Sequence, residues 1–334
     1  MLMKAMQLQR PARAEDSPLS LVDVTLPEPR EDEVRIKIQA CGVCHTDLHE
    51  IEGDLPLPKL PLVPGHEIIG MVDKLGRNVS EPAVGTRVGV PWLYSACGEC
   101  RFCRSERENL CERSRFTGYS VDGGYAEYSV VPAGFCYPLS GGLDPVEAAP
   151  LLCAGVIGYR ALKLSGVKPG QKLGLYGFGA SAHICLQIAR HWKCRTAVFT
   201  RAEKHKELAR ELGADWVGGV DDHPPWSLAS SVIFAPAGDI VPKALSALDK
   251  GGTLALGGIH MTPIPEMRYG LIYHERVVRS VANSTREDVR ELLGLAEEVP
   301  LKTSVETFPL EQANEALVQV KHSRTRAAAV LRIA

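Results

Sequence analysis

The chain has 334 residues, of which 45% are hydrophobic and 23% are charged, so it is long enough for about two globular domains with sizeable cores. Its formal net charge is −2, and a balance so close to neutral gives no reason to expect a nucleic acid or an anionic membrane as a partner. The first residues lack the apolar core of a signal peptide, and the sequence has no run of about 18 apolar residues, so we expect neither secretion nor a membrane span.

Short strands are expected through the first part of the chain. Glu33–Ala40 alternates apolar and polar side chains, as a half-buried strand does. Ile68–Leu75, Arg87–Val90 and Tyr125–Val131 are similar, and Gly, Pro and Asn residues lie between them. This pattern predicts a mostly-β domain with long loops.

Two thiols and an imidazole accompany these strands as candidate metal ligands. Cys44 lies in CGVCHTDLH, His66 and Glu67 follow a Pro-Gly turn, and Cys153 comes later in the chain. Two thiolates and one imidazole are a recognised catalytic zinc set, with a fourth position for water or substrate. Because distant ligands have no fixed interval, spacing alone leaves open a core cysteine at position 153 and a redox pair of Cys41 and Cys44.

Four further cysteines crowd into one polar, turn-rich stretch. The run ACGECRFCRSERENLC has Cys-x2-Cys-x2-Cys-x7-Cys spacing and contains Cys97, Cys100, Cys103 and Cys111. Four thiolates at this spacing can close on one tetrahedral ion, usually zinc, in a site that orders a loop but leaves no position open for chemistry. A pair of disulfides, an iron–sulfur cluster and a nucleic-acid-binding zinc ribbon are the alternatives.

Strands and helices alternate in the second part of the chain. Asp144 and Pro145 are expected to begin a helix that carries Cys153 and runs toward Lys163. The elements expected after it are strands at Lys172–Tyr176, Thr196–Phe199, Ser231–Ala235 and Thr253–Leu256, and helices at Ser181–Trp192 and Glu203–Leu212. This alternation predicts a parallel, doubly wound sheet. One more helix and a short β-rich tail follow about Arg286, and the tail is expected to return to the first domain.

A glycine-bearing turn joins the first of these strands to its helix. It resembles Gly-x-Gly-x-x-Gly with Ala in the last position, and its residues are Gly177, Phe178, Gly179, Ala180, Ser181 and Ala182. The glycines permit a tight turn and let a pyrophosphate approach the helix N-terminus. The next strand ends at Thr200 and Arg201, where an enzyme that prefers NAD usually has Asp or Glu. A hydroxyl and a guanidinium can instead hold a 2′-phosphate, so the sequence favours NADP over NAD.

The sequence resembles the zinc-dependent alcohol dehydrogenases of the medium-chain dehydrogenase/reductase family. The resemblance rests on four motifs in the family's order: GHE, the four-cysteine loop, the Cys-Ala-Gly segment at Cys153 and the dinucleotide turn. The resemblance covers nearly the whole chain. It implies an α/β protein with a GroES-like, mostly-β catalytic domain over residues 1–145 and 287–334. It also implies a Rossmann cofactor domain with a doubly wound parallel sheet over residues 146–286.

The same resemblance implies two zinc ions per subunit. Cys44, His66 and Cys153 would hold the catalytic zinc, and the four-cysteine loop would hold the structural one. Asp47 and Glu67 match positions from which a carboxylate orients the imidazole or tunes the metal.

Other matched positions concern the proton, the cofactor and the substrate. Thr46 and His49 match the family's proton relay. Gly258 and Ile259 match the stretch that passes the nicotinamide, and Arg286 matches an arginine that contacts the pyrophosphate.

The expected substrate site is apolar. Leu55, Trp92 and Phe116 match positions that line the substrate cleft in relatives, which suits alcohols and aldehydes with an aliphatic or aromatic chain. Relatives often have Thr beside the nicotinamide where this chain has Ile157, so that hydroxyl contact is absent here.

The implied function is hydride transfer between a primary aliphatic or aromatic alcohol and NAD(P), in a cytoplasmic homodimer or homotetramer. Polyol dehydrogenases of the family often have Glu as the third ligand, so Cys153 favours a simple-alcohol enzyme. The alternatives are a zinc-independent quinone or enoyl reductase on the same fold, a metal-stabilised binding protein without turnover, and a zinc-ribbon nucleic-acid binder. The near-neutral charge and the set of Cys44, His66 and Cys153 argue against the last two.

Overall fold

The computed structural model describes residues 1–140 and 142–334, which form two compact units. The first unit comprises Met1–Cys153, Asn283–Glu298 and Thr303–Ala334, and the second comprises Ala154–Ala282 and Val299–Lys302. The division at Cys153 comes later in the chain than the expected boundary at residues 145/146. The return at Asn283 comes earlier than the expected one at residue 287.

A mixed, largely antiparallel sheet forms the centre of the first unit, in the order β16-β17-β3-β4-β5-β9 with β8 also paired to β3. Its strands are β3 (Glu33–Val43), β4 (Glu67–Leu75), β5 (Arg87–Val90), β8 (Tyr128–Pro132), β9 (Tyr137–Pro138), β16 (Val305–Pro309) and β17 (Ala328–Arg332). The expected alternation in β3 is present, because Val34, Ile36 and Ile38 are fully buried in the core. β17 lies antiparallel to β3, with Ala329 opposite Val43, so the end of the chain completes the sheet.

Two smaller strand pairs accompany this sheet. A hairpin of β1 (Leu2–Leu8) and β2 (Leu19–Thr25) was not expected from the sequence. β6 (Leu93–Ser95) pairs with β7 (Arg115–Phe116), and the four-cysteine loop lies between them in the chain. This short ladder brings the two ends of the loop together.

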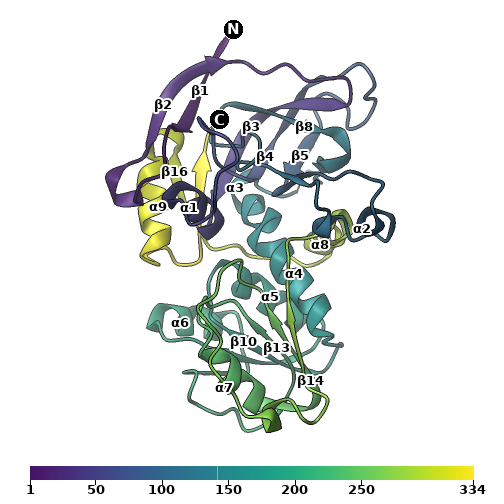
Figure 1. The fold of residues 1–334 in the computed structure, drawn as a ribbon, viewed down its shortest axis with the longest axis vertical. Coiled ribbons are helices and arrows are strands. Elements are labelled where there is room, and N and C mark those ends of the chain that lie inside the picture. The colour runs from purple at the N-terminus through teal and green to yellow at the C-terminus, as the bar shows by residue number, and fades with distance from the viewer. Residues whose placement is uncertain (141) are drawn as a thin grey trace. The chain divides into compact units, whose positions relative to one another are not determined.

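Helices of the first unit come from both ends of the chain. They are α1 (His45–Glu52), α2 (Arg101–Arg104), α3 (Pro145–Ala148), α8 (Arg286–Glu298) and α9 (Ala313–Lys321). The sequence predicts a short β-rich tail, and α9 is a helix that it does not predict. It buries Ala313, Ala316, Leu317 and Val320 and packs beside α1, as Figure 1 shows in yellow and purple.

The segment around Cys153 differs from the single helix that the sequence suggests. Asp144 caps α3 as expected, accepting a hydrogen bond from the Val146 N–H at 2.9 Å. A 3₁₀ turn, Ala149–Leu152, follows and contains Pro150, which has no N–H for an α-helical bond. Cys153 then lies outside helical geometry, and α4 (Ala154–Ser165) begins after it.

The second unit has a parallel sheet in the order β12-β11-β10-β13-β14-β15, the doubly wound arrangement that the sequence predicts. Its strands are β10 (Lys172–Tyr176), β11 (Arg195–Phe199), β12 (Trp216–Gly218), β13 (Leu228–Ile233), β14 (Leu248–Leu256) and β15 (Val277–Ser280). Its helices are α4, α5 (Ala180–His191), α6 (Glu203–Glu211) and α7 (Ile240–Ala247). α5 packs on β10 and β11, whereas α7 packs on β13 and β14 (Figure 1). Among the described residues, no helix has both the length and the hydropathy of a membrane span.

Candidate active site

The N-terminus of α1 fixes the first candidate ligand. Cys44 is the residue before the helix, and its sulfur accepts a hydrogen bond from the Thr46 N–H at 3.3 Å. In return, Asp47 accepts a hydrogen bond from the Cys44 N–H at 2.9 Å. This reciprocal capping arrangement satisfies helix-end donors and holds the Cys44 side chain in one orientation.

The three ligands expected from distant parts of the chain lie together. The Cys44 sulfur is 3.3 Å from His66 Nε2 and 3.9 Å from the Cys153 sulfur. The carboxylate of Glu67 joins them, so that four ligand atoms lie within 4.8 Å of one another. Two sulfurs, an imidazole nitrogen and a nearby carboxylate oxygen are a donor set that suits zinc.

Asp47 orients the imidazole of His66 through its Nδ1 side. His66 Nδ1–H donates to Asp47 Oδ1 at 2.9 Å, and both side chains are completely buried. With Nδ1 holding the proton, Nε2 is the ring nitrogen available to a metal. Asp47 therefore supports two ligands at once, Cys44 through its backbone and His66 through its ring.

Electrostatics at this cluster favour a cation. A hydrogen bond with Cys153 and burial both raise the pKa of the Cys44 thiol well above its usual value. Burial opposes protonation of His66, yet Asp47 and Cys44 outweigh it and raise the pKa of the imidazole. Surroundings that hold a proton so strongly also favour a divalent cation in its place.

The four-cysteine loop closes as its spacing predicts. All four sulfurs lie within 4.8 Å of one another, with Cys97 to Cys103 at 3.8 Å and Cys100 to Cys103 at 3.5 Å. Backbone N–H groups of Glu99 and Cys100 lower the pKa of Cys97 to about 6, which favours the thiolate that binds metal. None of the described cysteines forms a disulfide, contrary to the alternative of two bridges.

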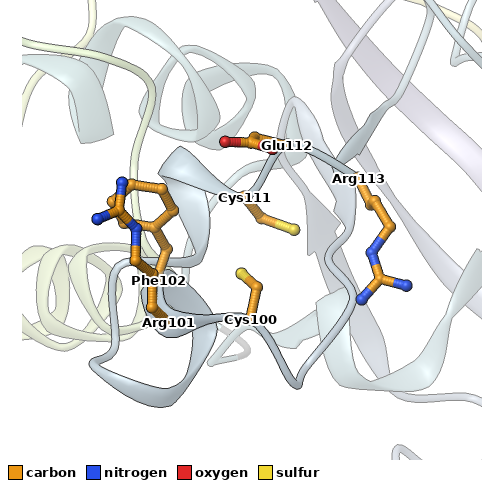
Figure 2. A pocket seen from close by; sticks show the side chains of 6 residues that line it. All are labelled: Cys100, Arg101, Phe102, Cys111, Glu112 and Arg113. Carbon is orange, nitrogen blue, oxygen red and sulfur yellow. The ribbon is translucent and has the colours of Figure 1, made fainter.

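A pocket opens at the side of this loop. Figure 2 shows the Cys100 and Cys111 sulfur atoms facing each other, with Arg101 and Phe102 on one side and Arg113 on the other. The Arg101 guanidinium lies 4.5 Å from the centre of the Phe102 ring. The loop therefore gathers four sulfurs in one cluster that has charged side chains around it.

The two relay residues lie on the same helix as the first ligand. Thr46 is buried in the first turn of α1, and His49 lies in its last turn. His49 Nδ1 pairs with Asp54 at 2.8 Å, and its side chain is partly exposed. Asp54 was not singled out in the sequence, although an acid five residues after a candidate proton donor is a signal that could have been noted.

Aromatic residues stand beside the candidate zinc ligands. The Trp92 ring lies 6.2 Å from the His66 ring and stacks on Phe116 at 4.4 Å between centroids. Tyr119, which the sequence did not suggest, lies 6.3 Å from both Trp92 and Phe116. We call Trp92, Phe116 and Tyr119 the aromatic wall. Leu55 lies after α1, where its N–H donates to the His49 carbonyl.

The glycine-bearing turn has the geometry that a dinucleotide requires. Gly177 follows β10 and has φ +83°, and a Cβ there would lie 2.9 Å from the Ala235 nitrogen, so only glycine fits without strain. Gly179 is the residue before α5, and within the described chain no atom lies within 4 Å of a Cβ placed on it. Phe178 and Ala182 are buried, while Ala180 and Ser181 form the first turn of α5. Open space at the N-terminus of a helix suits a pyrophosphate.

Strand ends carry the remaining cofactor candidates. Thr200 and Arg201 follow β11, with Thr200 buried and Arg201 exposed. Gly258 and Ile259 follow β14, and Ile259 is exposed. Because parallel strands end at the same edge of the sheet, these residues share that edge with Gly177. Ile157 lies in α4 of the same unit and is partly buried.

Arg286 has a partner that the sequence did not suggest. Its backbone N–H and its Nε donate to Glu108 at 2.8 Å and 3.2 Å, and its guanidinium lies over the Phe135 ring. Glu108 lies between the third and fourth cysteines of the four-cysteine loop and is buried. The contact therefore ties that loop to the start of α8, and the pyrophosphate contact expected of Arg286 stays a prediction.

Comparisons with known proteins agree with this geometry. The chain matches the family model of the alcohol dehydrogenase GroES-like domain over residues 30–141 and that of the zinc-binding dehydrogenases over residues 182–298. It is 44% identical to a probable alcohol dehydrogenase AdhA of Mycobacterium tuberculosis over 99% of this chain and 97% of that protein. It is 40% identical to an alcohol dehydrogenase of Geobacillus stearothermophilus over 94% of this chain and 96% of that protein.

The fold is shared with a solved plant enzyme. A cinnamyl alcohol dehydrogenase from Sorghum bicolor superposes with a TM-score of 0.90 at 25% identity, over 99% of this chain and 98% of that one. These similarities show an oxidoreductase of the alcohol dehydrogenase and aldehyde reductase class, and they do not favour the zinc-independent quinone or enoyl reductase. The chain belongs to the zinc-type, medium-chain alcohol dehydrogenases.

Proposed function

We propose that the protein is a zinc-dependent alcohol dehydrogenase or aldehyde reductase whose catalytic zinc is held by Cys44, His66 and Cys153. The observation that carries this proposal is the gathering of these three side chains, from three distant segments, within 4.8 Å. Bound there, zinc would supply a Lewis acid for the oxygen of an alcohol or a carbonyl. The Glu67 carboxylate is close enough to serve as an additional ligand.

Residues of α1 handle the proton in this proposal. The Thr46 hydroxyl accepts the proton of the alcohol as it donates its own along the relay, and the His49 imidazole, the last group of the relay, delivers a proton to solvent. Asp54 pairs with His49 Nδ1 at 2.8 Å and so orients the ring. Asp47 holds His66 in the tautomer that presents Nε2.

A second zinc belongs to the loop of Cys97, Cys100, Cys103 and Cys111. Its role is structural, because four sulfurs complete a tetrahedron and leave no position for substrate. Two zinc ions per subunit follow.

The cofactor is proposed to be NADP rather than NAD, bound over Gly177–Ala182. The support is at the end of β11, where Thr200 and Arg201 offer a hydroxyl and an exposed guanidinium. No acid stands at either position to accept bonds from the ribose hydroxyls of NAD. Gly258 and Ile259 are proposed to lie beside the nicotinamide.

The substrate class is a primary alcohol or aldehyde with an aliphatic or aromatic chain. The relatives named alcohol dehydrogenase and cinnamyl alcohol dehydrogenase support this class. So do the flat apolar faces of Trp92 and Phe116 beside His66, together with Leu55.

Self-association is proposed as a homodimer or homotetramer. β15 ends the sheet of the second unit and is exposed along its length, with Val277 46% and Val278 36% accessible. Tyr269 and Tyr273 add exposed apolar surface in the preceding segment. An apolar edge strand of this kind can pair with a second copy. Clustered free thiols suit the reducing cytoplasm, the proposed location.

Paired ligand variants test the two-zinc proposal. Cys153→Ala should hold one zinc per subunit instead of two, remain folded and lose benzaldehyde reduction with NADPH. Cys103→Ala should also lose one zinc but should lower the unfolding temperature. Metal analysis and thermal unfolding measure both, and a Cys153→Ala protein with two zinc ions and full activity would contradict the assignment.

A further inference from the structure

Helix α1 carries a second buried carboxyl, that of Glu50, which neither caps the helix nor bonds a candidate zinc ligand. Glu50 is completely buried, and both its carboxylate oxygens lack a hydrogen-bond partner among the described residues. Asp47, one turn earlier, differs because it bonds both the Cys44 N–H and His66. An unpaired carboxyl in the interior is costly, so its presence calls for a role.

The neighbours of Glu50 are the candidate active site itself. One oxygen of Glu50, one of Asp47 and a ring nitrogen of His66 lie within 4.8 Å of one another. The Asp47 oxygen and the His66 nitrogen are already bonded to each other at 2.9 Å. Glu50 therefore lies beside the bonded pair of Asp47 and His66, and its own oxygens can accept a hydrogen bond from another donor.

The missing donor is the indole of Trp92. Its Nε1 is also buried without a hydrogen-bond partner in the part of the chain that the structure describes. Both groups flank His66: a Glu50 oxygen lies within 4.8 Å of a His66 ring nitrogen, and the Trp92 ring lies 6.2 Å from the His66 ring. Burial and Asp47 raise the pKa of Glu50, whereas His66 and the Trp92 indole act in the opposite sense. An indole N–H only donates and a carboxylate can only accept, so pairing the two satisfies both.

We propose that Glu50 is a positioning residue that accepts a hydrogen bond from Trp92 Nε1–H and thereby fixes the aromatic wall beside His66. This inference rests on the proposed function in one respect, the placement of Trp92 at the substrate site. Trp92 stacks on Phe116 at 4.4 Å with 26° between the rings, so holding the indole also holds its neighbour. A wall fixed in this way favours flat aromatic substrates over small aliphatic ones.

Substrate kinetics on the zinc-loaded full chain give the first test. In Glu50→Ala, KM for benzaldehyde should rise about fivefold to tenfold, the effect of one lost hydrogen bond, while KM for acetaldehyde and both kcat values stay within about twofold. Glu50→Gln keeps an acceptor oxygen and should restore the benzaldehyde KM. Equal effects on both aldehydes, or no rescue by Gln, would overturn the proposal.

The matched control is Glu52, two residues along the same helix. Its carboxylate pairs with Lys321 at 2.6 Å and with the Ala14 N–H at 2.8 Å. Glu52→Ala should therefore perturb α1 without changing the ratio of the two KM values. A ratio that shifts equally in both variants would mean that any disturbance of α1 produces the effect, and would overturn a specific role for Glu50.

An indole signal tests the contact without any turnover. In protein labelled with ¹⁵N at tryptophan, the Nε1–H resonance that disappears in Trp92→Phe identifies Trp92. That resonance should shift in Glu50→Ala, remain near its position in Glu50→Gln and not move in Glu52→Ala. An unmoved resonance in Glu50→Ala would refute the hydrogen bond, whereas a shifted resonance in a protein without turnover would refute only the proposed function. A lower zinc content in Glu50→Gln than in the parent protein would instead make Glu50 a metal ligand and overturn the proposal.

Discussion

Asp47 shows how much of this site depends on one side chain. Its two oxygens hold the backbone of Cys44 and the ring of His66, each at 2.9 Å. Carboxylates in this position set the tautomer and orientation of a histidine ligand, and their loss commonly costs about tenfold to a hundredfold in metal affinity or activity. The candidate ligand set therefore depends on Asp47 as well as on the ligands themselves.

The proposed preference for NADP depends at the residue scale on Arg201. In Arg201→Asp, the carboxylate should repel a 2′-phosphate and accept bonds from ribose hydroxyls. We expect the ratio of kcat/KM for NADPH over NADH to fall about tenfold to a hundredfold. Initial rates with each nucleotide measure it, and Arg210→Asp on α6 controls for a change of local charge alone. An unchanged ratio in Arg201→Asp would remove the argument for NADP.

Much of this architecture was predictable at the scale of elements. β5 and β10 have the expected bounds, because their buried runs are short and flanked by turn residues. The expected Glu203–Leu212 helix is α6, which ends one residue earlier. The mixed β and doubly wound α/β fold class is confirmed.

Other elements escaped prediction for identifiable reasons. α9 has few strongly apolar residues, and only its contact with α1 and β17 shows which face is buried. The break at Cys153 follows from Pro150 within an apolar run that otherwise has helical character. Glu50 and Glu108 resemble ordinary surface acids in the sequence, because their burial depends on segments far away in the chain.

Helix α8 supplies a prediction about its first residue. Because Arg286 is bonded to Glu108, we expect Arg286→Gln to lower the free energy of unfolding by about 1 kcal/mol, a value reduced by the partial exposure of the arginine. KM for NADPH should rise as well, because the predicted contact with the pyrophosphate is lost. Urea unfolding and nucleotide kinetics separate the two roles. Lower stability with an unchanged KM would leave Arg286 only its contact with Glu108 and would contradict the pyrophosphate contact.

Helix α5 carries a buried histidine, His183, that makes the free energy of unfolding of the protein depend on pH. Burial lowers the pKa of His183 to about 4, against 6.5 in an unfolded chain, although the backbone of Gly179 and Ala180 acts in the opposite sense. Between these pH values the unfolded state binds more protons, so stability falls as the pH falls from about 6.5 toward 4. The slope attributable to this group approaches about 1.4 kcal/mol per pH unit.

His183→Gln isolates that contribution. The variant should be less stable at neutral pH, because it loses the contact of Nδ1 with the Gly179 carbonyl at 3.2 Å, but it should lose less stability on acidification. Urea unfolding at pH 7, 6 and 5 gives the two slopes. Parallel slopes would show that His183 does not titrate in this window.

The exposed edge of the second unit concerns the whole molecule. Val278→Lys places a charge on β15, where a second copy would pair, and should shift the protein toward monomer by at least about tenfold in dissociation constant. Sedimentation at several concentrations measures the shift. Leu21→Lys is a matched control on β2, at another exposed apolar residue of the first unit. An unchanged assembly in Val278→Lys would place the interface elsewhere.

The central claim is that zinc at Cys44, His66 and Cys153 is required for turnover. The most direct measurement is the initial rate of benzaldehyde reduction with NADPH before chelation, after chelation and after zinc is returned, with zinc counted at each step. We expect the rate to fall to background when the zinc at Cys44, His66 and Cys153 is lost from protein that remains folded, and to recover when zinc is restored. Full turnover by protein from which that zinc has demonstrably been removed would contradict it.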